Sequence, residues 1–400
     1  MASFLLPSVP YKKNVEQLIN IQTNINNNNK PIINRTLNTY LNNIKIQIET
    51  DVNNWDKYKK YTNPYEYIHT IIPNTKQSVS KLKPLSRSFY KMIEITNMLD
   101  LIDKKNSLQS FHLAEGPGGF IEAMCLMREN REDDKYYGMT LIDNNDPAVP
   151  GWNKTNNFLL KNQNVIIEKG HDQTGNIMNA DNLKYCYEKY KNSFDIITGD
   201  GGFDFSMDFN QQELVSSKLI FCQIAFAISL QKQYGHFVLK VFDTFTKVSI
   251  EFIYLLSLLY DEVYIVKPNT SRYANSEKYI VCKNFRLSDT SNLVTLLYSV
   301  ISNLKEGYYF NKILNVDVPY LYFNKLEEYN AIIGQQQIEN IASTLSLISN
   351  SKHERLELLK KNNIQKSILW CQKYKIPYHK NIQFINIFIN RNVDTELNLE

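Results

Sequence analysis

Four short stretches of this sequence carry residue types that could do chemistry. Glycine lets a backbone approach a ligand closely, and a helix start offers free N–H groups, while acids and amines can hold or move a proton. Taken singly, each stretch has a plainer explanation: a tight turn, a turn or N-cap aspartate, a sheet-edge lysine, or a capping acid in a polar loop. The stretches are "AEGPGGF" (114–120), "TGDGGF" (198–203, with Asp200), "HFVLKVF" (236–242, with Lys240) and "TSRYANSEKYIV" (270–281, with Glu277).

Lys240 interrupts an apolar run, which needs a reason because lysine is almost never fully buried unless it is paired. The unbroken apolar run predicts a strand with both faces covered. Lys240 lies near the C-terminal end of this strand. Its aliphatic stem can therefore pack in the sheet while its amine projects into a cleft.

Strands and helices alternate through the middle of the chain, and this order predicts an α/β fold with a mostly parallel sheet covered by helices on both sides. The last two strands are close in sequence, which favours an antiparallel hairpin at the sheet edge. Ligands of doubly wound sheets bind beyond the C-terminal ends of the strands, where all four stretches fall. The predicted strands are 110–115, 136–141, 164–170, 194–200, 236–242, 262–268 and 277–285.

The composition of the chain narrows the classes of protein further. A net charge of +4 and a pI near 8.5 are compatible with nucleic acid without pointing to it. The five cysteines are widely spaced, so we predict neither a zinc site nor a disulfide framework, and we expect a reducing compartment. We find no signal-peptide pattern and no uncharged apolar run long enough to span a bilayer, and therefore expect no membrane partner.

Together these residues resemble a family. "SFYKMIEI", "AEGPGGF", "TGDGGF", "HFVLKVFDTFT" and "KPNTSRYANSEKYIVCKNF", in this order, resemble the FtsJ/RrmJ-like 2′-O-methyltransferases over residues 85–285. "DGGFDFSMDFNQQE", "KVFDTFT" and "TSRYANSEKY" resemble the cap-specific mRNA branch found in eukaryotes and large DNA viruses.

The resemblance implies a Rossmann-like methyltransferase fold. Its sheet would be mostly parallel and seven-stranded, with an antiparallel edge hairpin and mainly helical N- and C-terminal extensions. The implied divisions are an N-terminal extension, partly of low complexity (1–80), an FtsJ-like methyltransferase domain (81–298) and a C-terminal helical region (299–400).

The family's Lys–Asp–Lys–Glu catalytic tetrad falls on four residues of this sequence. The methyl donor implied is S-adenosylmethionine, and no metal is needed. The sequence departs from the family at Asn176, where an aspartate would approach the adenine, and Asp172 is a rival for that role. The implied tetrad is Lys91, Asp200, Lys240 and Glu277, and the implied cofactor contacts are Glu115, Gly116, Pro117, Gly118, Gly119, Phe120, Asp143, Asn176 and Asp200.

The chemistry of the implied reaction suits these residue types. The RNA 2′-hydroxyl is a poor nucleophile while protonated, and the sulfonium donor is already activated. A neutral Lys240 would act as general base, whereas a charged Lys240 would orient the oxygen and stabilise developing negative charge. Asp200 would orient Lys240, and Lys91 with Glu277 would complete a frame around the ribose. The sequence leaves both roles of Lys240 open.

The implied partner is the capped 5′ end of mRNA, with other capping or transcription proteins bound through the C-terminal region. Aromatic rings could hold the cationic cap base, although most such rings are core or ordinary surface residues. The basic clusters "YKKY" (58–61) and "KLK" (81–83) could follow RNA phosphates, or be solvated faces. The candidate rings are Trp55, Tyr58, Tyr61, Trp152 and Phe245.

Three alternatives to a cap-specific 2′-O-methyltransferase remain. They are a 2′-O-methyltransferase for internal rRNA or tRNA positions, an inactive RNA-binding or scaffold subunit with the same fold, and a NAD-dependent oxidoreductase. The spacing of the glycines in "AEGPGGF" (114–120, the glycine loop) is not that of a dinucleotide-binding motif, which disfavours NAD. An inactive relative would be expected to lose a member of the tetrad or the glycine loop. We expect an intracellular location: the cytoplasm (a virus factory or the virion for a viral protein), with the nucleus as the alternative.

Overall fold

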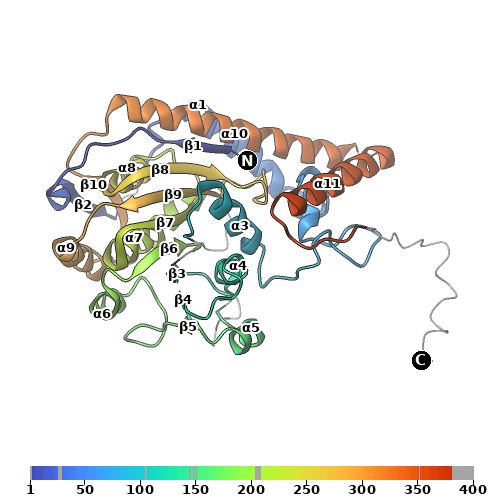
Figure 1. Cartoon of the computed structure of the whole chain (residues 1–400). Coiled ribbons are helices and arrows are strands. Elements are labelled where there is room, and N and C mark those ends of the chain that lie inside the picture. Colours follow the sequence, from blue (N-terminus) through green and yellow to red (C-terminus); the bar gives the residue numbers. More distant parts are fainter. Residues whose placement is uncertain are drawn as a thin grey trace.

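An eight-stranded mixed sheet forms the centre of the computed structural model, with strand order β1-β8-β9-β7-β6-β3-β4-β5 (Figure 1). β3 pairs in parallel with β4 and β6, and the parallel pairing continues to β5 and β7, whereas β9 is antiparallel to both β7 and β8. The predicted α/β fold is therefore confirmed. The strands are β1 (Ala2–Leu5), β3 (Gln109–Leu113), β4 (Lys135–Met139), β5 (Val165–Ile167), β6 (Phe194–Gly199), β7 (Gln231–Val241), β8 (Tyr260–Lys267) and β9 (Lys278–Phe285). The structure describes residues 2–25, 29–103, 106–143, 146, 149, 151–202, 209–350 and 352–380.

The edge of the sheet differs from the prediction. β8 and β9 form the expected hairpin, but β9 lies between β7 and β8, and the N-terminal strand β1 pairs antiparallel with β8, from Ala2 opposite Lys267 to Leu5 opposite Tyr264. The sheet therefore has eight strands instead of seven, and β1 closes the edge. Pairing satisfies backbone groups that β8 would otherwise leave open.

Helices cover both faces of the sheet, as expected. Alternate residues of β7 face opposite cores: Phe237 and Leu239 pack with α6 to α9, whereas Val238 packs with α3, α4 and α11. Coverage on both faces explains the unbroken apolar run around Lys240. The helices are α1 (Arg35–Glu49), α2 (Val52–Thr62), α3 (Ser88–Leu99), α4 (Gly119–Met127), α5 (Asn156–Lys161), α6 (Ala180–Tyr190), α7 (Gln212–Leu230), α8 (Lys247–Leu259), α9 (Ser291–Ser302), α10 (Tyr320–Ser349) and α11 (His353–Lys373).

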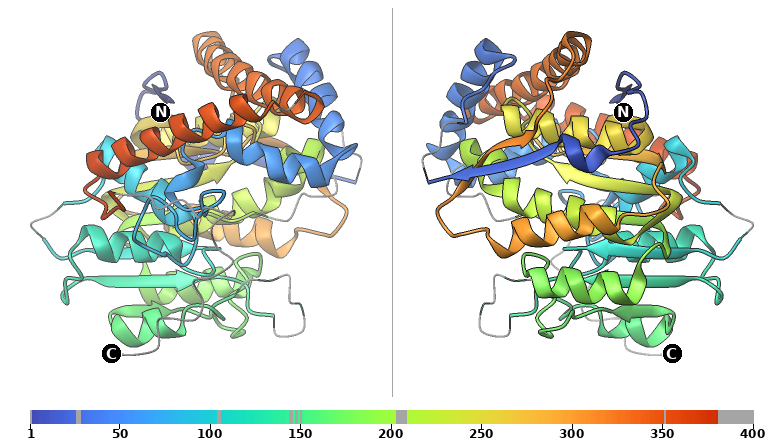
Figure 2. Two further views of the ribbon diagram at one scale, coloured as in Figure 1. Left: turned by 90° about the vertical axis from the view of Figure 1, so that its right-hand side faces the viewer. Right: turned by 90° about the vertical axis from the view of Figure 1, so that its left-hand side faces the viewer.

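The segments before and after the central sheet pack on each other. β2 (Ile19–Asn24) and β10 (Tyr309–Leu314) form a second, two-stranded sheet, and α10 contacts α1 and α2. In Figure 2 the orange and red C-terminal helices lie at the same end of the molecule as the blue N-terminal ones. Short 3-10 turns are η1 (Val15–Leu18), η2 (Glu66–Ile68) and η3 (Phe209–Gln211). The three predicted divisions of the chain stay a prediction.

Among the described residues, α7 is the one helix long and apolar enough to cross a membrane by length and composition. Of the most apolar 18-residue window of this helix, 78% is buried inside the fold. A helix that is apolar all round and covered on all sides is typical of the centre of a large core. α7 packs against β6, β7, α6, α8 and α9.

Candidate active site

Four side chains that are far apart in the sequence meet at the C-terminal ends of β6 and β7. Lys91 comes from α3, Asp200 directly follows β6, Lys240 lies near the end of β7, and Glu277 immediately precedes β9. They form two ion pairs, and the exposed fraction of each side chain is 12 or 13%. All four therefore lie just below the surface and keep a narrow access to solvent.

The first pair joins Lys91 to Glu277. Lys91 Nζ lies 2.7 Å from Glu277 Oε1 and 2.9 Å from Oε2, and Ser271 Oγ donates a hydrogen bond of 2.6 Å to Oε1. Burial alone would raise the pKa of Glu277, but the positive charges of Lys91 and Lys240 outweigh it and hold this pKa well below its usual range. Glu277 is therefore ionised at neutral pH.

The second pair joins Lys240 to Asp200. Lys240 Nζ lies 3.4 Å from Asp200 Oδ1 and donates a hydrogen bond of 2.6 Å to the backbone carbonyl oxygen of Asp200. The glycines after Asp200 make room for this arrangement. A Cβ atom at Gly202 would lie 3.2 Å from Lys240 Nζ, and one at Gly201 would lie 2.9 Å from Gln223 Oε1. The rest of "TGDGGF", Phe203, lies outside the described residues.

A side chain of the glycine loop caps the N-terminal end of α4. The buried carboxylate of Glu115 accepts hydrogen bonds from the backbone N–H groups of Phe120 (2.8 Å) and Ile121 (3.3 Å). Burial raises the pKa of Glu115 well above its ordinary value, although these two donors oppose the rise. The expectation that the helix start offers free N–H groups is therefore wrong at these two positions, because a side chain of the loop already occupies them.

The other residues of the loop divide into a packed and an accessible part. Gly119 is buried, and a Cβ atom there would lie 2.1 Å from Ser86 Oγ and 2.3 Å from Ser88 Oγ at the start of α3. Gly118 is also buried, and Phe120 has no exposed surface, whereas Gly116 and Pro117 are partly exposed. Among the predicted cofactor contacts in this loop, Gly116 and Pro117 are thus the two with partial exposure.

Three polar residues lie beyond β4 and β5. Asp143 is exposed, and Asn176 Oδ1 accepts a hydrogen bond of 2.9 Å from Met178 N–H. Burial alone would raise the pKa of Asp172, but hydrogen bonds donated by Thr174, Asn179 and Asn182 together outweigh burial and lower this pKa to about 2. Asp172 is therefore committed to shaping its own loop. The cofactor roles of Asp143 and Asn176 stay predictions.

A family model for FtsJ-like methyltransferases matches residues 84–285. The chain belongs to the FtsJ-like methyltransferase family. The match spans the sheet from β3 to β9, together with α3, and contains all four residues of the predicted tetrad. The family resemblance inferred from the motifs is confirmed.

Curated relatives of this FtsJ-like chain include cap-specific mRNA (nucleoside-2′-O-)-methyltransferase 1 from mouse, which is 30% identical over 67% of this chain and 32% of its own length. The protein of the same name from Dictyostelium discoideum is 29% identical over 72% of this chain and 40% of its own length. The chain thus spans about a third of the length of the curated relatives it matches. A solved Plasmodium falciparum structure, a putative ribosomal RNA methyltransferase, is 23% identical, with a TM-score of 0.36 over 50% of this chain and 98% of its own.

Tyr279 was missed by the reasoning from sequence and joins the two ion pairs of this FtsJ-like site. Its hydroxyl donates a hydrogen bond of 2.9 Å to Asp200 Oδ1, and Lys91 Nζ lies 6.0 Å from the centre of its ring. The available signal was the spacing from Glu277, because residues two apart at the start of a strand point to the same face.

The aromatic candidates for cap stacking are largely covered. Trp55, Tyr58 and Phe245 are at most 9% exposed, so their ring faces are occupied by the protein. Trp152 is partly exposed but packs against the glycine loop, where a Cβ atom at Gly118 would lie 3.4 Å from its ring. Among the five candidates, Tyr61 and Trp152 are the two with partial exposure.

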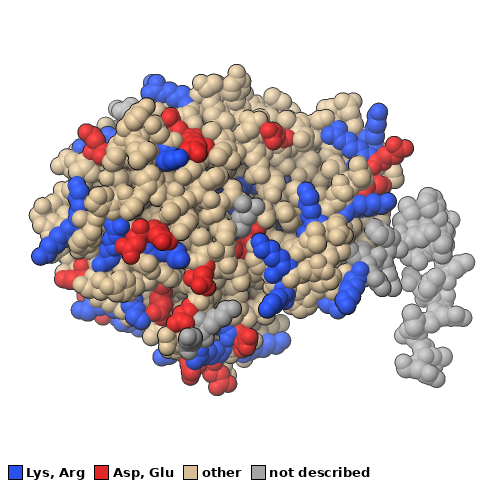
Figure 3. Space-filling view, turned by 45° about the horizontal axis from the view of Figure 1, so that its top comes forward, with Lys and Arg blue, Asp and Glu red and all other residues tan. Residues whose placement is uncertain are grey.

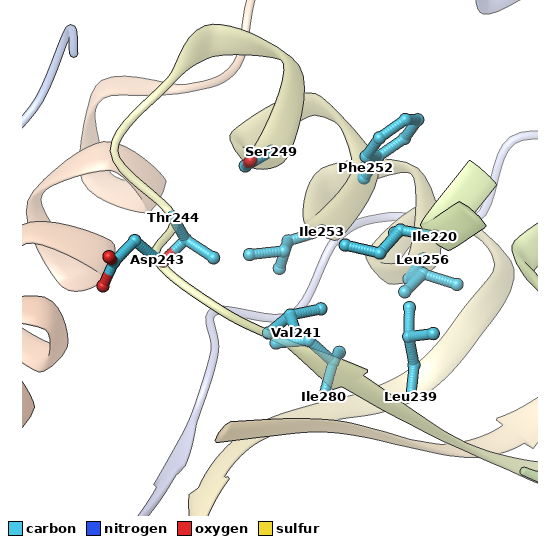
Figure 4. Close-up of a pocket in the computed structure, with 10 residues that line it drawn as sticks. All are labelled: Ile220, Leu239, Val241, Asp243, Thr244, Ser249, Phe252, Ile253, Leu256 and Ile280. Atoms are coloured by element: carbon cyan, nitrogen blue, oxygen red, sulfur yellow. The ribbon is translucent and has the colours of Figure 1, made fainter. Parts of the chain in front are cut away.

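A small enclosed cavity of about 10 Å³ lies between α8 and the sheet, away from the tetrad (Figure 4). Its lining is mainly apolar, including Leu239, Val241 and Ile253. The carboxylate of Asp243 points away from this space in Figure 4 and forms a 2.7 Å ion pair with the buried Lys45 of α1. An apolar space of this size is at the lower limit for one water molecule, so it is a packing void.

Proposed function

We propose that this chain is an S-adenosylmethionine-dependent RNA 2′-O-methyltransferase that acts on the first transcribed nucleotides of capped mRNA. One observation carries the proposal: the pairs Lys91–Glu277 and Lys240–Asp200 lie side by side, with Tyr279 in contact with both. The similarity to curated cap-specific mRNA methyltransferases supports the capped substrate.

In the proposed reaction, Lys240 acts directly on the ribose hydroxyl. Lys240 Nζ lies near two oxygens of Asp200, so one position of the amine remains for the 2′-hydroxyl. On an ammonium this position is a third N–H, which orients the oxygen; on a neutral amine it is the lone pair, which takes the proton. The hydroxyl proton would pass to the neutral amine, or to water where Lys240 is charged, while the oxygen takes the methyl group and the methyl–sulfur bond of the donor breaks. In both cases Asp200 fixes the direction of the amine.

The frame around the ribose is the role we propose for Lys91 and Glu277. Their short ion pair fixes the two side chains relative to each other. A fixed amine and carboxylate can bind ribose hydroxyls without rearranging as the reaction proceeds, and such positioning removes much of the entropic cost of the reaction.

The residues present fit S-adenosylmethionine as the methyl donor. A sulfonium requires a nearby anion, which Asp200 supplies, and the ribose hydroxyls require acceptors, for which the exposed Asp143 is a candidate. Gly116 and Pro117 would let the donor approach the loop. When bound, S-adenosylmethionine supplies an activated methyl group, and the protein contributes alignment and proton handling.

The RNA strand would follow a basic surface. Figure 3 shows Lys and Arg side chains gathered at the right of this face, where α2, α11 and the segment leading to α3 lie. Exposed lysines of α2 and of the segment leading to α3 include Lys57, Lys81 and Lys83. Phosphate contacts of this kind would make binding of RNA strongly dependent on salt.

The decisive experiment measures methyl transfer to a short RNA in capped and uncapped form, with the methylated nucleotide mapped in the product. We expect transfer from S-adenosylmethionine to the capped RNA and at least tenfold less to the uncapped one. Equal transfer to both, or a preference for an internal rRNA or tRNA fragment, would overturn the cap assignment. No transfer to any of these RNAs would point to an inactive scaffold.

A further inference from the structure

The loop from Pro268 to Glu277 carries one member of the predicted tetrad and contacts a single face of α3. Arg87, Lys91 and Glu94 stand four and three residues apart, so they project from the same face of this helix. All three touch the loop: Arg87 Nη2 donates to the carbonyl oxygen of Thr270 at 2.7 Å, and Lys91 pairs with Glu277. One helix face thus holds both ends of the loop.

Glu94 is the anchor at the start of the loop. It has no exposed surface, and its carboxylate accepts hydrogen bonds from Asn269 N–H (3.0 Å), Thr270 N–H (3.1 Å) and Thr270 Oγ–H (2.9 Å). A carboxylate with three donors is a strong, directional anchor, and removing it would leave buried N–H groups without an acceptor.

The end of the loop has an anchor of its own. Lys267, at the end of β8, donates hydrogen bonds of 2.5 Å to the carbonyl oxygens of Asn275 and Glu277. Lys267 is buried and fixes the backbone of Glu277 relative to the sheet. The start of the loop is therefore tied to α3 through Glu94, and its end is tied to β8 through Lys267 and to α3 through the Lys91–Glu277 pair.

We propose that Glu94 is a positioning residue for methyl transfer: it locks the loop 268–277 onto α3 so that the Glu277 carboxylate meets Lys91 beside the ribose. This inference rests on the proposed function, because it gives Glu94 a role through Glu277 instead of through contact with substrate. A merely structural Glu94 would lower stability without a specific effect on turnover.

Glu251 of α8 offers a matched control. It is also a buried glutamate, and its carboxylate accepts backbone N–H groups of Ile313 (2.6 Å) and Leu314 (3.2 Å), on the opposite side of the sheet from α3. Glu94→Gln and Glu251→Gln remove the same kind of bond. Only the first lies next to the predicted tetrad.

The experiment measures kcat and the KM for S-adenosylmethionine on capped RNA, together with hydrogen–deuterium exchange of the peptide 268–277, in wild type, Glu94→Gln and Glu251→Gln. We expect Glu94→Gln to lower kcat by about 10²-fold, since a small misplacement near reacting atoms has costs of this order, with the KM unchanged. Exchange in 268–277 should accelerate in Glu94→Gln and match wild type in Glu251→Gln.

Equal loss of kcat in both variants, or unchanged exchange of 268–277 in Glu94→Gln, would overturn the inference. A wild-type protein that methylates no capped RNA would instead refute the proposed function, and the exchange measurement would still test the lock. For the case in which Glu94→Gln does not fold, Thr270→Val removes one of the three bonds. It should then accelerate exchange and lower kcat to a smaller extent, and wild-type behaviour of Thr270→Val would count against the proposal.

Discussion

Lys240 is directed by two oxygens of a single residue, the side chain and the backbone carbonyl of Asp200. Because the acid at the end of β6 and the lysine at the end of β7 lie on neighbouring parallel strands, their register fixes this contact. Gly202 lies on the other side of the amine, and a Cβ atom there would be 3.2 Å from Nζ, so a side chain at this position would displace the amine slightly. The small residue at position 202 thus suits the space that Lys240 occupies.

Replacing Lys240 tests the proposed proton handling directly. Lys240→Ala should lower kcat by about 10²–10⁴-fold, the usual contribution of a group that handles a proton in the transition state. Binding of S-adenosylmethionine, measured by calorimetry, should stay close to wild type because Asp200 remains. A folded Lys240→Ala protein that retains most of its methyl transfer would falsify the role.

Lys267 makes the stability of the protein depend on pH. Burial lowers its pKa to about 7, although the negative charge of Glu277 opposes the shift. In the unfolded chain the lysine pKa is about 10.4, so between these values the unfolded state binds more protons and the free energy of unfolding rises with pH. This contribution is complete above about pH 10 and is lost as the pH falls through 7.

Urea unfolding of wild type and Lys267→Met from pH 6.5 to 9.5 measures this contribution. The wild-type free energy of unfolding should rise relative to the variant, by at most about 1.4 kcal/mol per pH unit for one proton. Lys278 is also buried with a lowered pKa, and it is present in both proteins. Parallel curves for the two proteins would contradict the shift assigned to Lys267.

At the scale of elements, α3 and α4 meet through a glycine. Gly119 begins α4, and its missing side chain lets the start of α3 approach, with Ser86 and Ser88 in contact. Since α3 carries Lys91 and Glu94, the distance between these helices sets where these two side chains lie. The glycine loop therefore helps to place Lys91 of the predicted tetrad, and its backbone is partly exposed at Gly116.

Gly119→Ala should move α3 away from α4. Its Cβ would also lie 3.1 Å from the backbone nitrogen of Phe89, so rotation of the serines alone does not relieve the contact. We expect a loss of about 1–3 kcal/mol in the free energy of unfolding, as for other overpacked sites, together with reduced methyl transfer. Gly334→Ala in α10, which meets only the flexible end of Leu37, should leave methyl transfer unchanged. Equal activity of the two variants would count against the role of Gly119.

The sequence was informative where a feature is local. Motifs placed Asp200 and Lys240 at strand ends, and the chain order of strands and helices predicted the α/β sheet. The pairing of β1 with β8 was out of reach because four residues near the N-terminus carry no signal for a partner so distant in the chain. The anchoring of Asn269 by Glu94 was missed for the same reason, because these residues are distant in the chain. The capping of α4 by Glu115 is a local contact that the reasoning from sequence overlooked.

At the scale of the whole molecule, the C-terminal segment returns to the chain just before α3. Lys81 N–H donates to the carbonyl oxygen of Pro377, and His379 N–H donates to that of Val79, both at 2.9 Å. α11 adds Trp370, whose ring meets that of Tyr90 edge-on at 5.6 Å. Binding of other capping or transcription proteins by this region remains our proposal. The contacts show that the region also packs against the segment before α3 and against α3 itself.

Trp370→Ala tests whether α11 supports α3. Trp370 is 3% exposed, and Tyr90 is the neighbour of Lys91 on α3. Loss of a buried tryptophan costs about 3–5 kcal/mol, because transfer energy is lost and a cavity forms. Chemical unfolding should show this loss, and methyl transfer at a temperature where the variant is folded should fall because α3 is less firmly held. Leu369→Ala, at a neighbouring position that is 53% exposed, should change neither quantity measurably. If Trp370→Ala unfolds like wild type, α11 is an appendage that adds nothing to the core, and its surface is then better explained by a partner than by support of the active site.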